Sequence, residues 1–421
     1  MQKIVIEGGK PLAGEVAVSG SKNATLPIMA ACLLAEGECR ISGAPRLTDV
    51  DTLGTVLGEL GAKVEHRADG ELAITVKDES KSTAEYDLVR TMRGSICVLG
   101  PLLAKRGFAK VSLPGGCVIG ARPIDLHLKG LQALGAEITC EHGYVTARAQ
   151  RLRGARVYMG GAFGSSVLAT ANVMMAAAMA EGQTVIEYAA CEPEIQDLAE
   201  FLIDMGASIE GAGTHRLVIR GVRRMDGARH RVIADRIAAG TFLAAAAATG
   251  GQVTVKGAEI GHLAAVLDRF EAAGAELATA DGGVRVEGAE LRGADVTTLP
   301  FPGFPTDMQA QFMAMMVTAQ GTSTITEKIY PERFMHAAEM TRLGAKINVR
   351  GNIAVIEGVE RLTGATVMAS DLRASAALII AGLVAEGRTD VRRIYHLDRG
   401  YEDLVGALQK LGASIRREDE E

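Results

Sequence analysis

Two kinds of helical segment alternate along this chain. The first kind is rich in Ala and Met, is hydrophobic on all sides, and is followed by a glycine and a strand-like stretch. A helix of this kind has to be buried, and a glycine suits the left-handed position that ends a helix. The second kind, such as 51–60 and 194–205, carries charged side chains on one face only, so we expect it to cover a sheet. Examples of the first kind with the strand that follows lie at 30–41, 174–186, 312–325 and 377–391.

The second marker of order is a Gly-Ala step followed by a polar and then an aliphatic residue. It recurs six times, about 70 residues apart, in phase with the apolar helices. Within each unit of about 70 residues, the pattern therefore predicts a strand, a buried helix, a strand, an amphipathic helix and two strands. Six such βαβαββ units predict an α/β protein of two domains with three repeats each, and the basic segment 221–234 is the best candidate for the linker. The steps begin at Gly61, Gly135, Gly206, Gly274, Gly344 and Gly412.

Composition narrows the class of protein. A chain of 421 residues exceeds one ordinary core, and a net charge of −6 argues against nucleic acid as the main partner. The start of the chain has a strand pattern and no signal-peptide pattern. Apolar runs such as 173–180 cover about half of a membrane span. We therefore expect a cytoplasmic protein without a membrane partner.

The cysteines point to one unusual loop. The six of them show no metal-ligand spacing, so no metal site is expected, and most are expected to pack as small apolar residues. Cys117 differs, because glycines flank it on both sides within 113–123, and Arg122 follows closely. Such a loop can reshape around its thiol, and Arg122 could lower the pKa of the thiol or hold an anion. The alternative is a surface turn with an inert cysteine.

Polar residues gather where the apolar helices begin. Lys22 and Asn23 lie at the first start, where free N–H groups attract anions; the alternative is an Asn cap beside a solvated lysine. Arg93 lies at the second start, before a helix expected over 96–104. The third start is the Gly- and Ser-rich stretch 160–166, whose N–H groups could bind a phosphate although it matches no nucleotide-binding fingerprint.

The later repeats begin with carboxylates. Asp235-Arg236 opens the fourth apolar helix and Asp371-Leu372-Arg373 the sixth. At the fifth, Thr306 is expected to cap the helix and Asp307 to lie in its first turn, a structural role that would suffice for that carboxylate. Arg399 lies in a later loop. If the buried helices of each domain are parallel, their positive ends converge, and two such domains form an electropositive cleft for a small polyanion.

Six motifs together resemble the family of UDP-N-acetylglucosamine enolpyruvyltransferases, also called 1-carboxyvinyltransferases. The resemblance runs from the first strand to the last repeat. The motifs are Gly20-Ser21-Lys22-Asn23, Leu113-Pro114-Gly115-Gly116-Cys117, Arg122-Pro123-Ile124-Asp125-Leu126, Phe304 to Gln311, Asp371-Leu372-Arg373-Ala374 and Asp398-Arg399-Gly400-Tyr401.

The resemblance implies a pair of inverse α/β barrels. Residues 22–232 would form a first domain that carries the Cys117 loop, and 1–21 with 233–421 a second that carries Asp307. The implied reaction moves the enolpyruvyl group of phosphoenolpyruvate to the 3-hydroxyl of UDP-N-acetylglucosamine and releases phosphate, the first committed step of peptidoglycan and thus cell-wall synthesis. No cofactor is expected.

The resemblance also implies roles for single residues. Cys117 matches a proton donor that fosfomycin attacks, and Asp307 matches the carboxylate that takes the hydroxyl proton. Lys22, Arg122 and Arg399 match cations around phosphoenolpyruvate, with Asn23 beside them. Asp371 and Arg373 match a supporting pair at the hinge. Contacts to the nucleotide sugar are implied for Arg93, Arg122, Pro123, Ile124, Asp125, Leu126, Gly164, Ser165, Ser166, Val167 and Ile329.

Two departures from the family pattern keep other functions open. The family often has a lysine and a Ser-Val-Gly run where this chain has 160–167, and Glu-Thr where it has Ile237-Ala238. One alternative is a 5-enolpyruvylshikimate-3-phosphate synthase, although that family has Ser after the lysine and lacks the Gly-Gly-Cys loop. The other is a noncatalytic nucleotide-sugar-binding protein.

Overall fold

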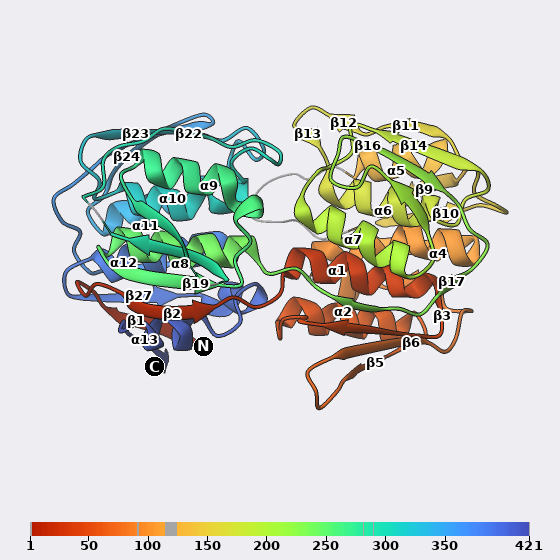
Figure 1. Cartoon of the computed structure of the whole chain (residues 1–421), viewed down its shortest axis with the longest axis horizontal. Helices are drawn as coiled ribbons and strands as arrows, with labels where there is room; N and C mark the ends of the chain where they lie inside the picture. Colours follow the sequence, from red (N-terminus) through yellow and green to blue (C-terminus); the bar gives the residue numbers. More distant parts are fainter. Residues whose placement is uncertain (1, 91, 114–123, 281, 289, 421) are drawn as a thin grey trace. The chain divides into compact units, whose positions relative to one another are not determined.

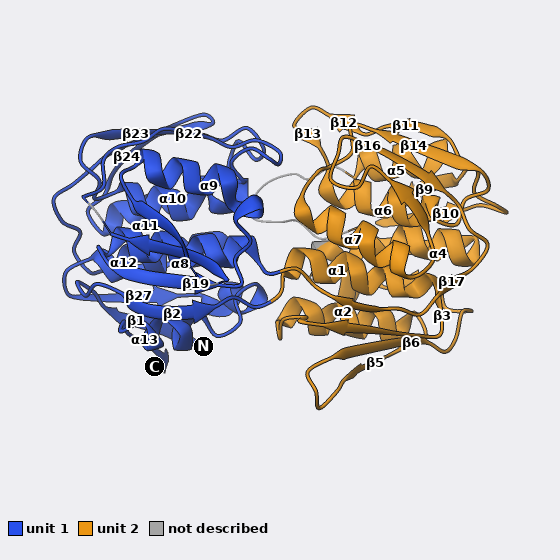
Figure 2. Ribbon diagram, viewed as in Figure 1, with its two compact units in different colours: residues 1–19, 118–120, 234–421 blue, residues 20–117, 121–233 orange. Residues whose placement is uncertain are grey.

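The computed structural model describes residues 2–90, 92–113, 124–280, 282–288 and 290–420. These residues divide into two compact units (Figure 2). Of the described residues, those up to 19 and from 234 onwards belong to unit 1, and those of 20–113 and 124–233 belong to unit 2. Each unit has its own hydrophobic core, so each is described by itself.

Three four-stranded sheets surround the helices of each unit (Figure 1). In every one of the six sheets the first two strands are parallel and the remaining neighbours are antiparallel. The sheets of unit 2 are β18 (Arg229–Arg231), β4 (Glu38–Ser42), β6 (Leu72–Val76) and β5 (Ala62–His66); β7 (Thr83–Ala84), β8 (Phe108–Ser112), β10 (Tyr144–Arg148) and β9 (Glu137–Glu141); and β11 (Arg156–Tyr158), β14 (Gln183–Glu187), β16 (Arg216–Arg220) and β15 (Ser208–Glu210).

Unit 1 repeats this order with one rearrangement. Its first strand in sequence, β1, pairs antiparallel with both β27 and β28, so the start of the chain completes the sheet formed by its end. The sheets of unit 1 are β2 (Ala13–Ala17), β19 (Gln252–Lys256), β21 (Gly283–Glu287) and β20 (Glu276–Ala280); β22 (Val296–Thr297), β23 (Thr322–Thr326), β25 (Ile353–Glu357) and β24 (Lys346–Arg350); and β26 (Thr366–Met368), β27 (Arg388–Arg392), β1 (Gln2–Glu7) and β28 (Ser414–Asp419).

The helices fall into the two kinds that the sequence predicts. In unit 1 the inner helices α8 (Arg236–Ala248), α10 (Gln309–Met316) and α12 (Leu372–Val384) contact one another, and nearly all of their residues are buried. The outer helix α9 (Ile260–Ala272) buries only Leu263, Val266 and Phe270, one face of the helix. The other outer helices of this unit are α11 (Met335–Arg342) and α13 (Leu404–Lys410), and the 3-10 helices are η3 (Thr306–Met308) and η4 (Ile394–Arg399).

Unit 2 follows the same plan, so the predicted fold class with six βαβαββ repeats is confirmed. Within the described ranges no helix is long and apolar enough to cross a membrane. The inner helices are α1 (Lys22–Ala31), α4 (Leu99–Arg106) and α6 (Val167–Ala177), and the outer ones α2 (Thr48–Glu59), α5 (Asp125–Ala133) and α7 (Pro193–Asp204). Smaller elements are η1 (Cys32–Leu34), α3 (Tyr86–Val89), η2 (Arg93–Val98), and the strand pairs β3 (Ala35–Glu36) with β17 (Met225–Asp226) and β12 (Gly160–Gly161) with β13 (Gly164–Ser165).

Four repeats have a glycine at the same position, where the absence of a side chain allows the chain to approach a neighbouring strand closely. A Cβ atom added there would lie 2.2 to 2.3 Å from the carbonyl oxygen of the residue that begins the neighbouring central strand. The backbone of these glycines is not left-handed, so close approach alone requires them. The pairs are Gly154 with Gln183, Gly227 with Glu38, Gly293 with Thr322 and Gly364 with Arg388.

We predict that Gly364→Ala lowers the free energy of unfolding by about 1 to 3 kcal/mol, because the new methyl group collides with backbone that cannot rotate away. Urea unfolding followed by circular dichroism measures the change. Gly261→Ala is the matched control: this glycine lies in α9 with no atom near its missing Cβ, so alanine there should stabilise the protein by up to about 1 kcal/mol. Equal effects of the two substitutions would contradict the packing argument.

Candidate active site

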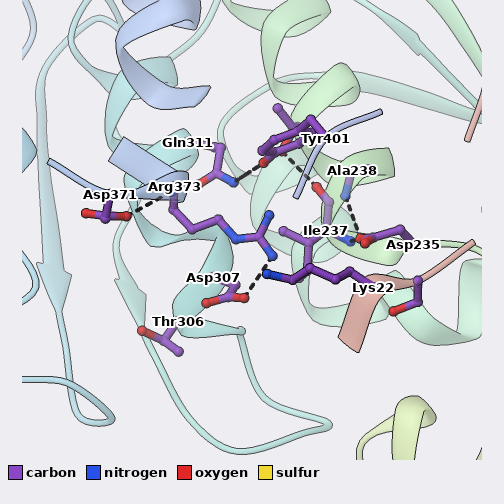
Figure 3. Close-up of polar contacts among 12 residues, drawn as sticks. Lys22, Asp235, Ile237, Ala238, Thr306, Asp307, Gln311, Asp371, Arg373 and Tyr401 are labelled. Atoms are coloured by element: carbon purple, nitrogen blue, oxygen red, sulfur yellow. Dashed lines mark hydrogen bonds and ion pairs between the residues drawn. The ribbon is translucent and has the colours of Figure 1, made fainter. Parts of the chain in front are cut away.

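Carboxylates lie at the beginnings of the three inner helices of unit 1. Asp235 caps α8 by accepting hydrogen bonds of 2.9 Å from the backbone N–H groups of Ile237 and Ala238. Asp371 caps α12 in the same way, with 2.8 Å to the N–H of Arg373. Asp307 lies in η3, directly before α10. Each carboxylate is thus at the positive end of a helix dipole, and the inner helices bring these ends into one region (Figure 3).

Two buried arginines hold the carboxylate of Asp307. Arg373 Nη2 donates to its Oδ2 at 2.9 Å and Arg333 Nη1 to its Oδ1 at 2.8 Å. The arginine side chains are only 4% and 5% exposed, whereas that of Asp307 is 28% exposed. The carboxylate is therefore held at both oxygens, while its side chain is partly accessible to solvent.

This pairing controls the ionisation of Asp307. Burial alone would raise its pKa, but the charges and hydrogen bonds of Arg373 and Arg333 outweigh burial and hold the pKa well below its usual range. Asp307 is therefore an ionised hydrogen-bond acceptor at neutral pH. A carboxylate paired in this way is also a weak base.

The predicted cap at Thr306 is wrong. No side-chain cap precedes η3, and the hydroxyl of Thr306 instead donates to Glu327 Oε2 at 2.8 Å while it accepts from Arg333 Nη1 at 3.0 Å. Thr306 therefore helps to orient Arg333. Tertiary contacts have replaced the local capping interaction.

Glu327 and Arg333 have structural roles here that we did not predict. Glu327 is fully buried, and its Oε1 accepts from the backbone N–H of Ile329 at 2.8 Å, which fixes the backbone at that predicted site residue. Both lie in the irregular segment between β23 and α11, where no periodic pattern guides the assignment. The one available signal was a charged residue on each side of an otherwise apolar Ile-Tyr-Pro run.

The segment that carries Arg399 packs against the start of α12. Arg399 is half-buried and ends η4. The residue before it, Asp398, forms an ion pair with Arg417 of β28. A Cβ atom on the residue after it, Gly400, would lie 2.3 Å from Leu372 Cδ2. Both neighbours of Arg399 are therefore anchored to unit 1.

In unit 2, Lys22 is the first residue of α1. Ser21 caps this helix, with Oγ 3.3 Å from the N–H of Ala24, so the alternative in which Asn23 is the cap is wrong. Lys22 Nζ lies 3.1 Å from Asp49 Oδ2, and the two side chains are 13% and 7% exposed. Lys22 is therefore a positioned cation, not a solvated one, and half-buried Asn23 follows it in the first turn.

The other predicted residues of unit 2 lie on two adjoining segments. Asp125 and Leu126 begin α5, while the pair β12–β13 forms a short hairpin whose next residue, Ser166, caps α6 through its hydroxyl. A Cβ atom on Gly161 would lie 3.2 Å from Leu126 Cδ1, so hairpin and helix start are in contact.

The structure leaves part of the prediction outside its description. Arg93 begins a 3-10 turn, η2, and the α-helix expected from residue 96 begins only at Leu99. Cys117, Arg122 and Pro123 lie outside the described residues. Of the other cysteines, Cys140 is exposed and four are buried. Among the described side chains, no group of three His, Cys, Asp or Glu could hold a metal ion.

We predict that Asp307→Asn lowers the free energy of unfolding at pH 7 by on the order of 3 kcal/mol, because two buried guanidinium groups lose their counter-charge. The folded pKa of Asp307 lies below the unfolded value of about 3.9. Its stabilising effect is therefore complete above that value and is lost as pH falls through the folded pKa.

Urea unfolding of both forms from pH 7 to pH 3 tests this prediction, and the difference between them should begin to shrink below about pH 4. Asp268→Asn serves as control, since Asp268 pairs with Arg269 on the exposed surface and should matter by less than about 1 kcal/mol. A difference in unfolding free energy that is small at pH 7, or that grows on acidification, would contradict the prediction. It would show that the ion pairs of Asp307 with Arg333 and Arg373 contribute no such stabilisation.

Comparison with known proteins shows the family to which the chain belongs. A family model for EPSP synthase (3-phosphoshikimate 1-carboxyvinyltransferase) matches residues 6–408. Two curated proteins named UDP-N-acetylglucosamine 1-carboxyvinyltransferase are similar over their whole lengths. The protein from Methylacidiphilum infernorum (isolate V4) is 53% identical over 421 residues, covering 99% of both chains. The protein from Anaeromyxobacter sp. (strain Fw109-5) is 56% identical over 423 residues, covering 99% of this chain and 100% of its own.

Among solved structures, the enolpyruvyl transferase NikO from Streptomyces tendae superimposes with a TM-score of 0.88 at 26% identity, covering 100% of this chain and 99% of NikO. The match therefore includes both units and all six repeats. The chain belongs to the EPSP synthase family of enolpyruvyl transferases.

Proposed function

We propose that this enolpyruvyl transferase uses UDP-N-acetylglucosamine as acceptor and phosphoenolpyruvate as donor, and releases phosphate. The observation that carries the proposal is the identity of 53% and 56%, over the whole chain, to relatives that bear the name of this activity. The family model carries the name of the shikimate enzyme, whereas the full-length relatives carry the name of the UDP-N-acetylglucosamine enzyme and support the proposed acceptor.

The reaction needs fixed positive charge around phosphoenolpyruvate. We assign this role to Lys22, Arg122 and Arg399. Lys22 supports the assignment because its ammonium group is held at the start of α1 by Asp49, where helix N–H groups also favour an anion. Arg399 supports it because the residues on both sides of it are anchored. Cations held in advance stabilise developing negative charge without reorganisation.

Transfer proceeds by addition followed by elimination. The acceptor oxygen bonds to C2 of phosphoenolpyruvate while a proton adds to C3. The bond from C2 to the phosphate oxygen then breaks, and a proton leaves C3 to restore the double bond. We assign protonation of C3 to Cys117, and interaction with the acceptor hydroxyl to Asp307.

The pairing of Asp307 with Arg333 and Arg373 is the basis of the role that we assign to this carboxylate. The ionised carboxylate, which is partly accessible to solvent, first accepts a hydrogen bond from the acceptor hydroxyl. As the oxygen bonds to C2, the hydroxyl becomes strongly acidic and its proton can pass even to a weak base. Arg373 acts as a supporting residue of Asp307, and Asp371 supports Arg373 through the backbone N–H that begins α12.

We assign contacts with the nucleotide sugar to the residues that the resemblance implies. In unit 2 these are Arg93, the run from Arg122 to Leu126, and the hairpin and helix start from Gly164 to Val167, with Asn23 in α1. In unit 1 the assigned residue is Ile329, whose backbone is fixed by Glu327. The proposal requires no cofactor. The cytoplasmic location expected from the sequence is part of the same proposal.

We predict that the purified protein releases phosphate from phosphoenolpyruvate only when UDP-N-acetylglucosamine is present. A coupled phosphate assay measures the release, and product mass identifies the enolpyruvyl ether. Shikimate 3-phosphate is the control acceptor. Phosphate release with shikimate 3-phosphate and none with UDP-N-acetylglucosamine would overturn the proposed acceptor.

We also predict that fosfomycin labels Cys117 and that Cys117→Ser abolishes the label, because serine lacks a thiolate nucleophile. Intact-protein mass spectrometry counts the adducts. Cys140→Ser is the control, since Cys140 is exposed. This variant should keep the full label on Cys117. A label that persists in Cys117→Ser would contradict the assignment of the loop.

A further inference from the structure

Tyr401 stands two residues after Arg399 and is only 5% exposed. Its hydroxyl lies 2.8 Å from Thr241 Oγ1 and 3.3 Å from Gln311 Nε2. Gln311 Nε2 also donates a hydrogen bond to Thr241 Oγ1 at 3.1 Å. The hydroxyl of Thr241 donates its only proton to the carbonyl oxygen of Ile237 at 2.8 Å. Tyr401 is therefore the donor to Thr241 and the acceptor from Gln311 (Figure 3).

The ring of Tyr401 contacts a different partner. The guanidinium carbon of Arg373 lies 5.5 Å from the ring centroid, a cation–π distance. Arg373 is the residue that donates to Asp307. Thr241 belongs to α8, Gln311 to α10 and Arg373 to α12, so Tyr401 contacts one polar residue on each inner helix of unit 1.

Core packing does not explain this arrangement. A phenylalanine would fill nearly the same volume, and a buried polar group loses its hydration at a cost in free energy that only hydrogen bonds offset. The network is not fully satisfied, since Gln311 Oε1 has no partner among the described residues. A polar network of this kind fixes position more than it adds stability.

We propose that Tyr401 is a positioning residue for two groups of the site. Its hydroxyl fixes the end of η4 and thereby the place of Arg399, and its ring supports Arg373 and thereby Asp307. Gly400 joins Arg399 to Tyr401, and Leu372 packs closely against it, since a Cβ atom there would lie 2.3 Å from Leu372 Cδ2. The kinetic part of the inference rests on the proposed function, in which Arg399 binds phosphoenolpyruvate.

Two substitutions separate hydroxyl from ring. Tyr401→Phe keeps the ring beside Arg373, so it should raise the KM for phosphoenolpyruvate about tenfold, the size of one or two lost hydrogen bonds. The kcat and the KM for UDP-N-acetylglucosamine should stay within about twofold. Tyr401→Leu removes the ring as well, so kcat should also fall about tenfold.

Tyr395→Phe is the matched control, because Tyr395 lies in η4, which ends two residues before Tyr401, and is 55% exposed. It should leave all three constants unchanged. An unchanged KM for phosphoenolpyruvate in Tyr401→Phe, with only a lower melting temperature, would show a purely structural role and overturn the proposal. Equal rises of both KM values would overturn it too, since they indicate general distortion.

A second readout needs no activity. In Tyr401→Phe, amide hydrogen exchange of residues 394–401 should become at least about fivefold faster, as expected when a local hydrogen-bond anchor is lost. Exchange in α8, α10 and α12 should stay as in the unmodified protein, and Tyr395→Phe should change none of these segments. Unchanged exchange in 394–401 overturns the proposal even if the protein proves to use another acceptor.

Discussion

Burial of helices that are apolar on every side is the constraint on which this structure depends. Three such helices pack together in unit 1, and their first N–H groups lose water when their beginnings are enclosed. Asp235 and Asp371 satisfy those groups at α8 and α12. The same packing that makes the core therefore collects polar side chains at one end of the helices. A site at that end follows from the fold, before any residue is chosen for chemistry.

Charge at that end has to be balanced inside unit 1 itself. Arg333 and Arg373 are almost entirely buried, and a buried guanidinium group without a counter-charge would cost several kcal/mol. Asp307 supplies the balance, and the pKa of its carboxyl falls as a consequence. The same ion pairs thus stabilise the two buried arginines and set the ionisation of Asp307. The pairing that balances these two buried charges also keeps Asp307 ionised at neutral pH.

Regular structure is the part that could be predicted from the sequence. Helical periodicity and the repeated Gly-Ala step locate the six repeats, and the first residues of the inner helices, such as Lys22 and Asp371, follow from them. The capping details could not be predicted, because Ser21 and Asn23 are both good caps and because Thr306 is drawn away by a tertiary contact. Arg333 and Glu327 lie between regular elements. Their partners come from distant positions, which no local pattern encodes.

This division has a consequence for how one fold serves different acceptors. Among the described groups assigned to phosphoenolpyruvate, Lys22 begins α1, and the segment that carries Arg399 packs against the start of α12. The groups assigned to the nucleotide sugar lie mostly on segments outside that regular pattern, such as the β12–β13 hairpin and the turn at Ile329. Such segments can change length and sequence without disturbing the buried helices. The residues that we propose for the acceptor on these segments could therefore differ between proteins of this fold without a change in the core.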